Sequence, residues 1–181
     1  MLGRFAGIMI ALALPLSAIA AETTTPNPEV VDNPFYRLEL PKDWKIVTRG
    51  PPIQARGPHN QLMVLDLGVP NISPDDAEAV AQMKKGDDHW KAQIRGIMNE
   101  EVTQEGMTVT EPLNETIVNG RPFWRAKAVV EKDGGFVSAY GFIGYAGTYF
   151  LVRVAGSLKD KAASEAAAEA MLQNIVWSHK Q

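Results

Sequence analysis

The second half of the chain is divided at regular intervals by dipeptides that end in glycine. These dipeptides are Asn119-Gly120, Asp133-Gly134 and Ala146-Gly147. Asn-Gly and Asp-Gly supply the positive φ angles that tight β-hairpins need. The stretches that they separate read as extended strands over residues 107–118, 121–132, 135–145 and 148–155. Strands joined by tight turns pair with their sequence neighbours, so this half of the chain predicts an antiparallel meander.

Shorter extended segments precede the meander. Apolar and polar positions alternate over residues 35–40, which predicts a half-buried strand. A second extended piece begins at Trp44, and a short strand is expected over residues 53–56. Residues 61–69 are more continuously apolar, as expected of a strand near the centre of a sheet.

Two regions carry helical signals. Ser73 is the expected N-cap of a helix whose first position is Pro74, and residues 86–88 either kink this helix or start a second one. An apolar stripe at helical spacing follows at Trp90, Ile94, Ile97 and Met98. A closing helix is expected over residues 159–174, with small residues on the side that we expect to face the sheet: Ala162, Ala163, Ala166, Ala170 and Met171. The order of elements predicts an α+β fold in one domain, residues 35–181.

The N-terminus has the pattern of a secretory signal peptide. One positive charge precedes an uncharged apolar run, and small residues lead to an expected cleavage before Ala21. Residues 1–20 are therefore a predicted signal peptide, and residues 21–34 a flexible leader. We expect a periplasmic or secreted protein that is soluble, without a membrane anchor once the signal is cleaved.

Composition narrows the classes of function. The chain has no cysteine, which excludes disulfides, thiol catalysis and thiolate metal sites. It has 18 basic and 21 acidic side chains and no basic run. This balance argues against nucleic acid and anionic lipid surfaces as partners.

The sequence around Trp44 suggests a relationship to a known group of proteins. Pro41 ends a strand by removing a hydrogen-bond donor, a turn follows, and Trp44 is expected to anchor the next strand in the core. The strand ending "LELPKDWKI", the order of elements and the final "LQNIVW" resemble the PsbP-like superfamily. This group includes an extrinsic photosystem subunit, a Ran-binding nuclear import factor and DcrB-like bacterial envelope proteins. The resemblance covers most of residues 35–177 and implies a three-layer α/β/α sandwich with a mostly antiparallel sheet. It implies no activity, because members mostly bind or stabilise protein assemblies.

No local pattern predicts catalysis. His59, His89 and His179 do not share ligand spacing, and we expect each at the surface. The pairs Asp75-Asp76 and Asp87-Asp88 lack the alternating ligands and glycine of a calcium loop, and helix capping accounts for both. The sequence therefore predicts no catalytic residue, no metal site and no cofactor.

The meander offers one candidate binding surface. By alternation, one face of its strands collects small apolar residues, and we expect the closing helix there. The other face collects aromatic and basic residues, a composition typical of protein interfaces. From this face we predict a partner-binding set consisting of Arg125, Tyr140, Tyr149 and Arg153. Two alternatives remain: the long helix covers this face, or part of it stays open as a groove.

Three hypotheses for function follow. The first is a non-catalytic accessory protein that binds an envelope or secreted protein partner. The second is a carrier of a small apolar ligand held between the sheet and the long helix. The third is a hydrolase assembled from dispersed residues such as His59 and Asp66.

Overall fold

The computed structural model describes residues 28–68, 71–85, 87–118, 121–143 and 148–177. Its strands are β1 (Val30–Asp32), β2 (Tyr36–Glu39), β3 (Lys45–Thr48), β4 (Ile53–Arg56), β5 (Leu62–Gly68), β6 (Met107–Val118), β7 (Arg121–Val130), β8 (Gly135–Ile143), β9 (Tyr149–Ser157) and β10 (Val176–Trp177). The helices are α1 (Ala77–Lys84), α2 (Asp87–Val102) and α3 (Lys161–Gln173), with short 3₁₀ turns at η1 (Glu131–Asp133) and η3 (Leu158–Asp160). The expected signal peptide and residues 21–27 lie outside the described residues.

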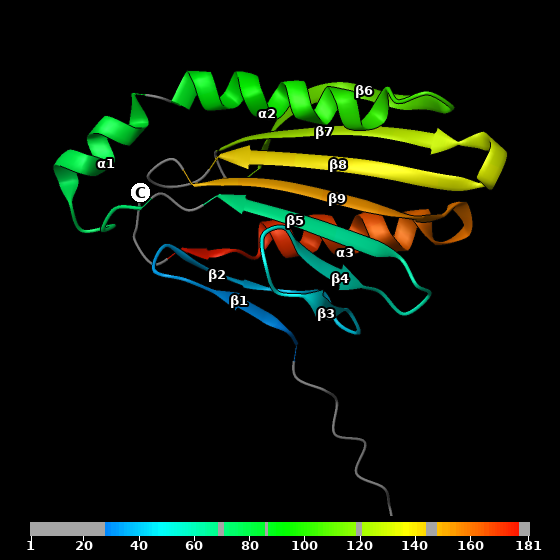
Figure 1. The fold of residues 1–181 in the computed structure, drawn as a ribbon, viewed down its shortest axis with the longest axis horizontal. Coiled ribbons are helices and arrows are strands. Elements are labelled where there is room, and N and C mark those ends of the chain that lie inside the picture. Colours follow the sequence, from blue (N-terminus) through cyan, green and yellow to red (C-terminus); the bar gives the residue numbers. More distant parts are fainter. Residues whose placement is uncertain (1–27, 69–70, 86, 119–120, 144–147, 178–181) are drawn as a thin grey trace, which may run out of the picture.

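The strands of the described residues form two sheets, both shown in Figure 1. The larger has seven strands in the order β3-β4-β5-β9-β8-β7-β6. The smaller has the order β1-β2-β10. Each pairing is antiparallel. The predicted meander is confirmed, because β6, β7, β8 and β9 are consecutive neighbours, and β9 then pairs with β5 near the centre of the sheet.

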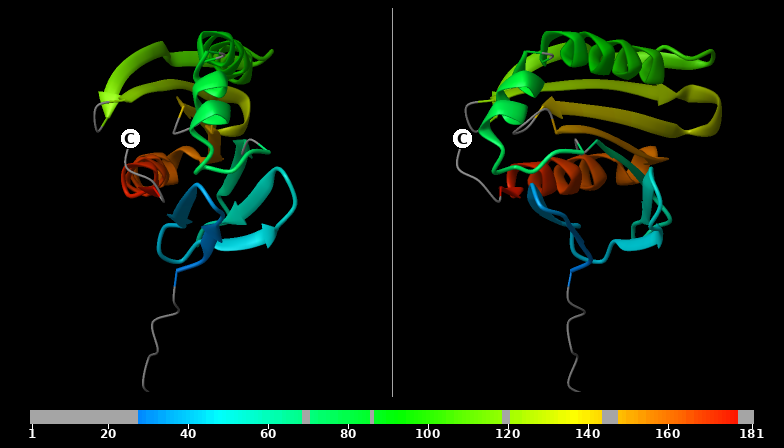
Figure 2. Two further views of the ribbon diagram at one scale, coloured as in Figure 1. Left: turned by 90° about the vertical axis from the view of Figure 1, so that its left-hand side faces the viewer. Right: turned by 60° about the vertical axis from the view of Figure 1, so that its left-hand side comes forward.

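The larger sheet is the middle of three layers. Helix α2 packs on one face, over β6, β7 and β8. Helix α3 and the smaller sheet lie on the other face, where α3 contacts β9 and β2. Figure 2 shows the two helices on opposite sides of the strands. The α/β/α layering implied by the PsbP-like resemblance is confirmed, with a small second sheet added to the α3 layer.

Small residues on the sheet allow α2 to approach closely. The sheet presents Ala126, Ala139 and Gly141 to the buried α2 residues Ile94 and Met98. A Cβ atom added at Gly141 would lie 2.4 Å from Met98 Sδ and 2.7 Å from Ile94 Cγ2. Contacts this short would force the α2 side chains to move, so glycine is the residue that fits at this position.

The opposite face of the sheet is built from large side chains. Phe136, Tyr140 and Phe150 are buried there with Trp44, which is 4% exposed. The Trp44 N–H donates to the Pro41 carbonyl oxygen at 3.1 Å, which closes the predicted turn. The interpretation of Trp44 as a core anchor is confirmed.

The prediction for the closing helix is wrong in its orientation. Ala162, Ala163, Ala166 and Ala170 of α3 are exposed, and the buried positions are Ser164, Ala168, Met171 and Leu172. The small face of the sheet receives the large residues of α2 instead. Helix α3 packs beside the aromatic face, where the smaller sheet fills much of the remaining space. The exposed alanines of α3 therefore do not pack against the sheet.

Two boundaries also differ from the prediction. The N-cap of the first helix is Asp76, whose Oδ1 accepts from the Ala79 N–H at 3.0 Å. Ser73 instead accepts from the Asp75 N–H in the preceding turn. Strand β1 lies inside the segment predicted to be a flexible leader, because its backbone pairs with β2.

Candidate functional site

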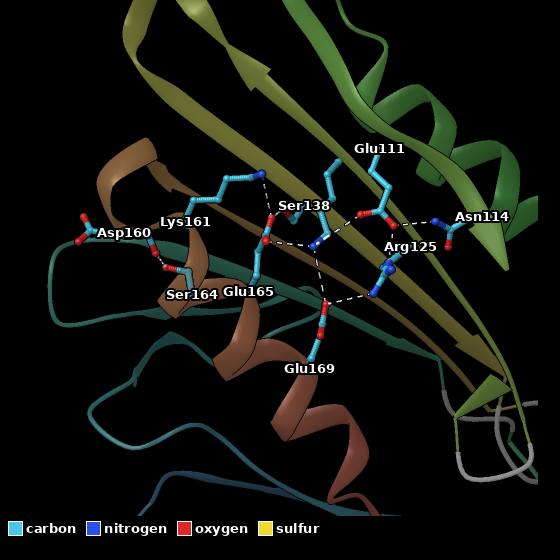
Figure 3. A network of polar contacts seen from close by, with 10 residues as sticks. Glu111, Asn114, Arg125, Ser138, Asp160, Lys161, Ser164, Glu165 and Glu169 are labelled. Carbon is cyan, nitrogen blue, oxygen red and sulfur yellow. Dashed lines mark hydrogen bonds and ion pairs between the residues drawn. The ribbon is translucent and has the colours of Figure 1, made fainter. Parts of the chain in front are cut away.

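A cluster of charged and polar side chains joins the sheet to α3, and Figure 3 shows most of it. We call it the sheet–helix network. Its members are Glu111, Asn114, Arg125, Lys127, Ser138, Lys161, Glu165 and Glu169. The sheet members come from β6, β7 and β8, and the others from α3.

Lys127 is the centre of this network. Its Nζ lies 3.0 Å from Glu165 Oε2, 3.7 Å from Glu111 Oε2 and 3.8 Å from Glu169 Oε1. The side chains of Lys127 and Glu165 are each only 13% exposed. Glu165 also accepts a hydrogen bond of 2.6 Å from the Ser138 hydroxyl. A half-buried ammonium with three carboxylates around it is strongly held, because removing charges from water is costly unless they are paired.

Helix periodicity and strand register bring these groups together. Lys161, Glu165 and Glu169 follow one another at four-residue intervals on one helix face. Lys127 on β7 lies directly opposite Ser138 on β8, so both point to the same side of the sheet. The i, i+4 spacing on the helix was visible in the sequence and is the signal that could have located the helix half of this network.

The network shifts the acid–base behaviour of its members. Burial raises the pKa of Glu111, but hydrogen bonds from Arg125 and Asn114 and the positive charges of Arg125 and Lys127 together hold it below its usual value. The pKa of Arg125 is raised mainly by its hydrogen bond to Glu111. Burial, with the negative charges of Glu169 and Glu165, raises the pKa of Tyr140 far above its usual value.

The structure divides the four predicted partner-binding residues between the two faces of the sheet. Arg125 and Tyr140 are cross-strand neighbours on the α3 side. Tyr140 is wholly buried, and its hydroxyl has no hydrogen-bond partner among the described residues. The predicted face of β9 is wrong, because Val152 rather than Arg153 lies opposite Tyr140. Tyr149 and Arg153 therefore lie on the α2 side.

On the α2 side, Arg153 joins the sheet to the helix. Its Nη1 donates to Glu101 Oε1 at 2.7 Å, and its side chain is 34% exposed. Tyr149 is partly exposed, and its pKa is raised by burial and by the charge of Asp66. Partner binding by the four residues stays a prediction, now divided between two surfaces.

The dispersed hydrolase residues also have different neighbours from those expected. His59 Nδ1 lies 2.7 Å from Asp160 Oδ1, not beside Asp66. The imidazole is exposed, whereas Asp160 is buried and its Oδ2 has no partner among the described residues. The pair joins the loop between β4 and β5 to the start of α3. The other predicted surface histidines are His89, which is exposed, and His179, which lies outside the described residues.

A small pocket lies between the sheet and α2, where the carrier hypothesis places its ligand. Its lining residues are Asp66, Gln93, Ile94, Ile97, Tyr149 and Leu151. Its volume is about 40 Å³. Ligand sites commonly measure roughly 300–1,000 Å³, so this space admits only molecules close to the size of water.

The described residues contain no group of three or more His, Asp or Glu side chains placed to hold a metal ion. Asp76 caps α1 through its carboxylate, as the helix-capping interpretation of the Asp75-Asp76 pair expects. Within the same described ranges, no helix has the length and apolar character needed to cross a bilayer.

Comparisons with known proteins identify the fold. No family model matches the chain, and no curated protein matches its sequence. The crystal structure of LpqN, involved in cell envelope biogenesis of Mycobacterium tuberculosis, is similar at a TM-score of 0.53 and 14% identity. That match covers 84% of this chain and 91% of LpqN.

The second similar structure is the solution structure of cyanobacterial PsbP (CyanoP) from Synechocystis sp. PCC 6803. It has a TM-score of 0.51 and 9% identity, and the match covers 90% of this chain and 99% of CyanoP. Two nearly complete matches of this kind agree with the element order and with the three layers. The chain has a PsbP-like fold.

Proposed function

We propose that the protein is a non-catalytic accessory protein that acts outside the cytoplasm by binding a protein partner of the cell envelope or the exported fraction. The observation that carries this proposal is the PsbP-like fold, which the chain shares with an envelope-biogenesis protein and with CyanoP. The pattern of a signal peptide at residues 1–20 supports the location. Fold alone does not assign an activity, so the chemistry of the side chains has to agree with it.

The chemistry of the sheet–helix network agrees with a structural role for the charged residues on the α3 side. Each of its carboxylates contacts a lysine or an arginine within the network. The pocket beside α2 gives no support to the carrier of a small apolar ligand, since its volume is far below that of an ordinary ligand site.

Of the predicted contact residues, Tyr149 and Arg153 are the ones that we place in the partner interface. Both are partly exposed on the α2 side of the sheet. Aromatic and arginine side chains supply much of the binding energy in protein interfaces. We assign Tyr140 and Arg125 to the packing of α3, because Tyr140 is buried and Arg125 contacts Glu111 and Glu169.

Affinity capture of the full chain from the exported fraction of its own cells tests this function. The wild-type protein should enrich a protein partner reproducibly, and purified partner should then bind it in a direct assay. Arg153→Ala should weaken binding at least tenfold, whereas Arg37→Ala should not. Arg37 is a matched control because it is also an ion-paired arginine, placed on the smaller sheet.

Other outcomes would contradict the accessory role. A small molecule retained by the purified chain in native mass spectrometry, with no protein partner, would favour the carrier. Turnover of an ester or peptide library that disappears in His59→Ala would favour the hydrolase. Equal loss of binding in both arginine variants would remove Arg153 from the interface.

A further inference from the structure

Among the described residues, helix α2 covers only part of the face of the larger sheet on which it packs. Helix α2 packs on β6, β7 and β8, and α3 lies behind β5 and β4 as Figure 1 is viewed. The turned views in Figure 2 agree with this arrangement. We call the remaining part the open face; its exposed and partly exposed residues, assigned by cross-strand pairing, are Lys45, Gln54, Arg56, Leu62, Val137, Arg153 and Ala155, and Val64 is buried among them.

Strand register orders the open face into rows. One row crosses five strands, because each of its residues lies directly opposite the next: Lys45, Arg56, Leu62, Ala155 and Val137. Lys45 and Arg56 are exposed, and the three apolar residues are partly exposed. Adjacent strands lie about 4.8 Å apart, so this row is roughly 19 Å long. The row therefore has two cations at one end and an apolar strip at the other.

The two cations differ from the charged groups of the sheet–helix network, which are held in ion pairs. Neither Lys45 nor Arg56 has a carboxylate partner within the described ranges, and Arg56 donates only to the backbone oxygen of Asn60, at 3.2 Å. Arg153 in the neighbouring row is already paired with Glu101. The end of the face at Lys45 and Arg56 is basic although the whole chain has a net charge of −3, and Asp66, the acid on this side of β5, lies beside α2 instead. Such a local excess of one charge favours a partner of the opposite charge.

We propose that the open face binds an acidic segment of the protein partner, with carboxylates at Lys45 and Arg56 and an apolar side chain over Leu62 and Ala155. This inference rests on the proposed function and identifies its surface. An acidic polypeptide fits better than a lipid surface, because the cations occupy one end of a row whose centre is apolar. Arg153, at the border with α2, extends the contact toward the interface residues named above.

A zero-length carboxyl–amine cross-linker applied to the full chain in its native exported fraction tests the contact. This reagent joins a lysine only to a carboxylate that touches it. We expect cross-links from Lys45 to aspartate or glutamate of another polypeptide and few from Lys132, which is exposed outside this face. Cross-links from Lys45 to a second copy of this chain would overturn the assignment of the occupant.

Charge reversal supplies the quantitative test. The double variant Lys45→Glu with Arg56→Glu should lower capture of the partner at least tenfold, because like charges would then face each other. The control Lys132→Glu with Lys159→Glu changes the net charge equally and should retain capture. Both variants should melt within about 2 °C of the wild type, since exposed substitutions change stability little.

The outcomes separate this inference from the proposed function. If the wild type captures no partner, the proposed function fails. If the wild type and both charge-reversal variants capture the partner equally, the function stands and the acidic-segment assignment is wrong. Vesicles of phosphatidylglycerol give a further arm, and binding to them that depends on Lys45 and Arg56 would assign the face to a membrane surface and overturn the proposal.

Discussion

The sheet–helix network and the open face place their charged side chains in opposite environments. In the network, Lys127 is largely buried and lies near three carboxylates, all within 4 Å. On the open face, Lys45 and Arg56 are exposed and have no carboxylate partner within the described part of the chain. Buried charges require partners inside the fold, whereas exposed charges are stabilised by water and remain available.

This contrast separates residues that hold the fold together from residues that can serve binding. Replacing a network charge leaves partly buried charges of opposite sign with fewer partners. Replacing an open-face charge leaves only water behind. Lysine and arginine side chains thus have two roles in one sheet, one structural and one in binding. The change in folding stability on mutation distinguishes the two roles.

The largest effect should come from Lys127→Met, which keeps the apolar stem and removes the ammonium. We expect a loss of about 3 kcal/mol in the free energy of unfolding, because the largely buried Glu165 would lose its closest cation and keep only Lys161, at 3.7 Å. Chemical denaturation measures this loss. The matched variant Lys45→Met should change stability by less than about 0.5 kcal/mol. Equal effects of the two variants would show that the network does not depend on its central lysine.

The helix-covered and open halves of the sheet should respond differently to added volume. Gly141→Ala places a Cβ within 2.4 Å of Met98 Sδ and should cost about 2 kcal/mol of stability through overpacking. Ala155→Val on the open face should be nearly neutral, because Ala155 is partly exposed and no helix of the described residues packs on it. Thermal melting of both variants checks this pair. A stable Gly141→Ala protein would mean that α2 adjusts its position easily.

A gain in stability is expected from Tyr140→Phe. The hydroxyl of Tyr140 is buried with no hydrogen-bond partner among the described residues, so its removal should raise the free energy of unfolding by about 1 kcal/mol. Tyr36→Phe is the control and should give no such gain. Tyr36 is also buried and burial raises its pKa to about 12, but its hydroxyl is not among the buried atoms that lack a partner in the described residues. A destabilised Tyr140→Phe would indicate a bound water at this hydroxyl.

The smallest expected effect is on how folding stability changes at acidic pH. The pKa of Glu111 is lowered in the folded state, with the Arg125 hydrogen bond as the main stabilising contact against burial. Its contribution to stability is therefore present above the usual carboxyl pKa of 4.5 and is lost as the pH falls through the lowered value. Glu111→Gln should lose less stability than the wild type between about pH 5 and pH 3. Parallel curves in urea denaturation over this range would contradict the assignment.

Sequence patterns located most elements but not the faces of every strand. The glycine-ending dipeptides placed the strands of the meander, and alternation placed Trp124, Ala126 and Ala128 on one face of β7. The same reasoning failed on β9, which carries buried residues on both faces. Phe150 and Leu151 point to opposite faces and are both buried, so the alternation of polar and apolar residues does not show which face is exposed to solvent. The face is then set by the register with β8.

The candidate site was predictable only in part. Arg125 was identified as a candidate from its position among aromatic residues on β7, but its partners Glu111 and Glu169 lie 14 residues before it and 44 residues after it in the chain. Period-four spacing of Glu165 and Glu169 marks one helix face without showing what that face meets. Pairing between charges on different elements is a property of the packing, and no local pattern reports it.

The sequence alone determined the order of the longer strands and helices, the anchoring role of Trp44 and the lack of thiol chemistry, because these depend on local backbone preference and on composition. The tertiary structure decided which helix covers which face, which charges are paired, and that part of the sheet stays open. These features depend on how side chains from distant segments fill one volume. Helix α2 meets the small face because its Ile94 and Met98 fit against Gly141, a match of shapes that exists only after the chain has folded.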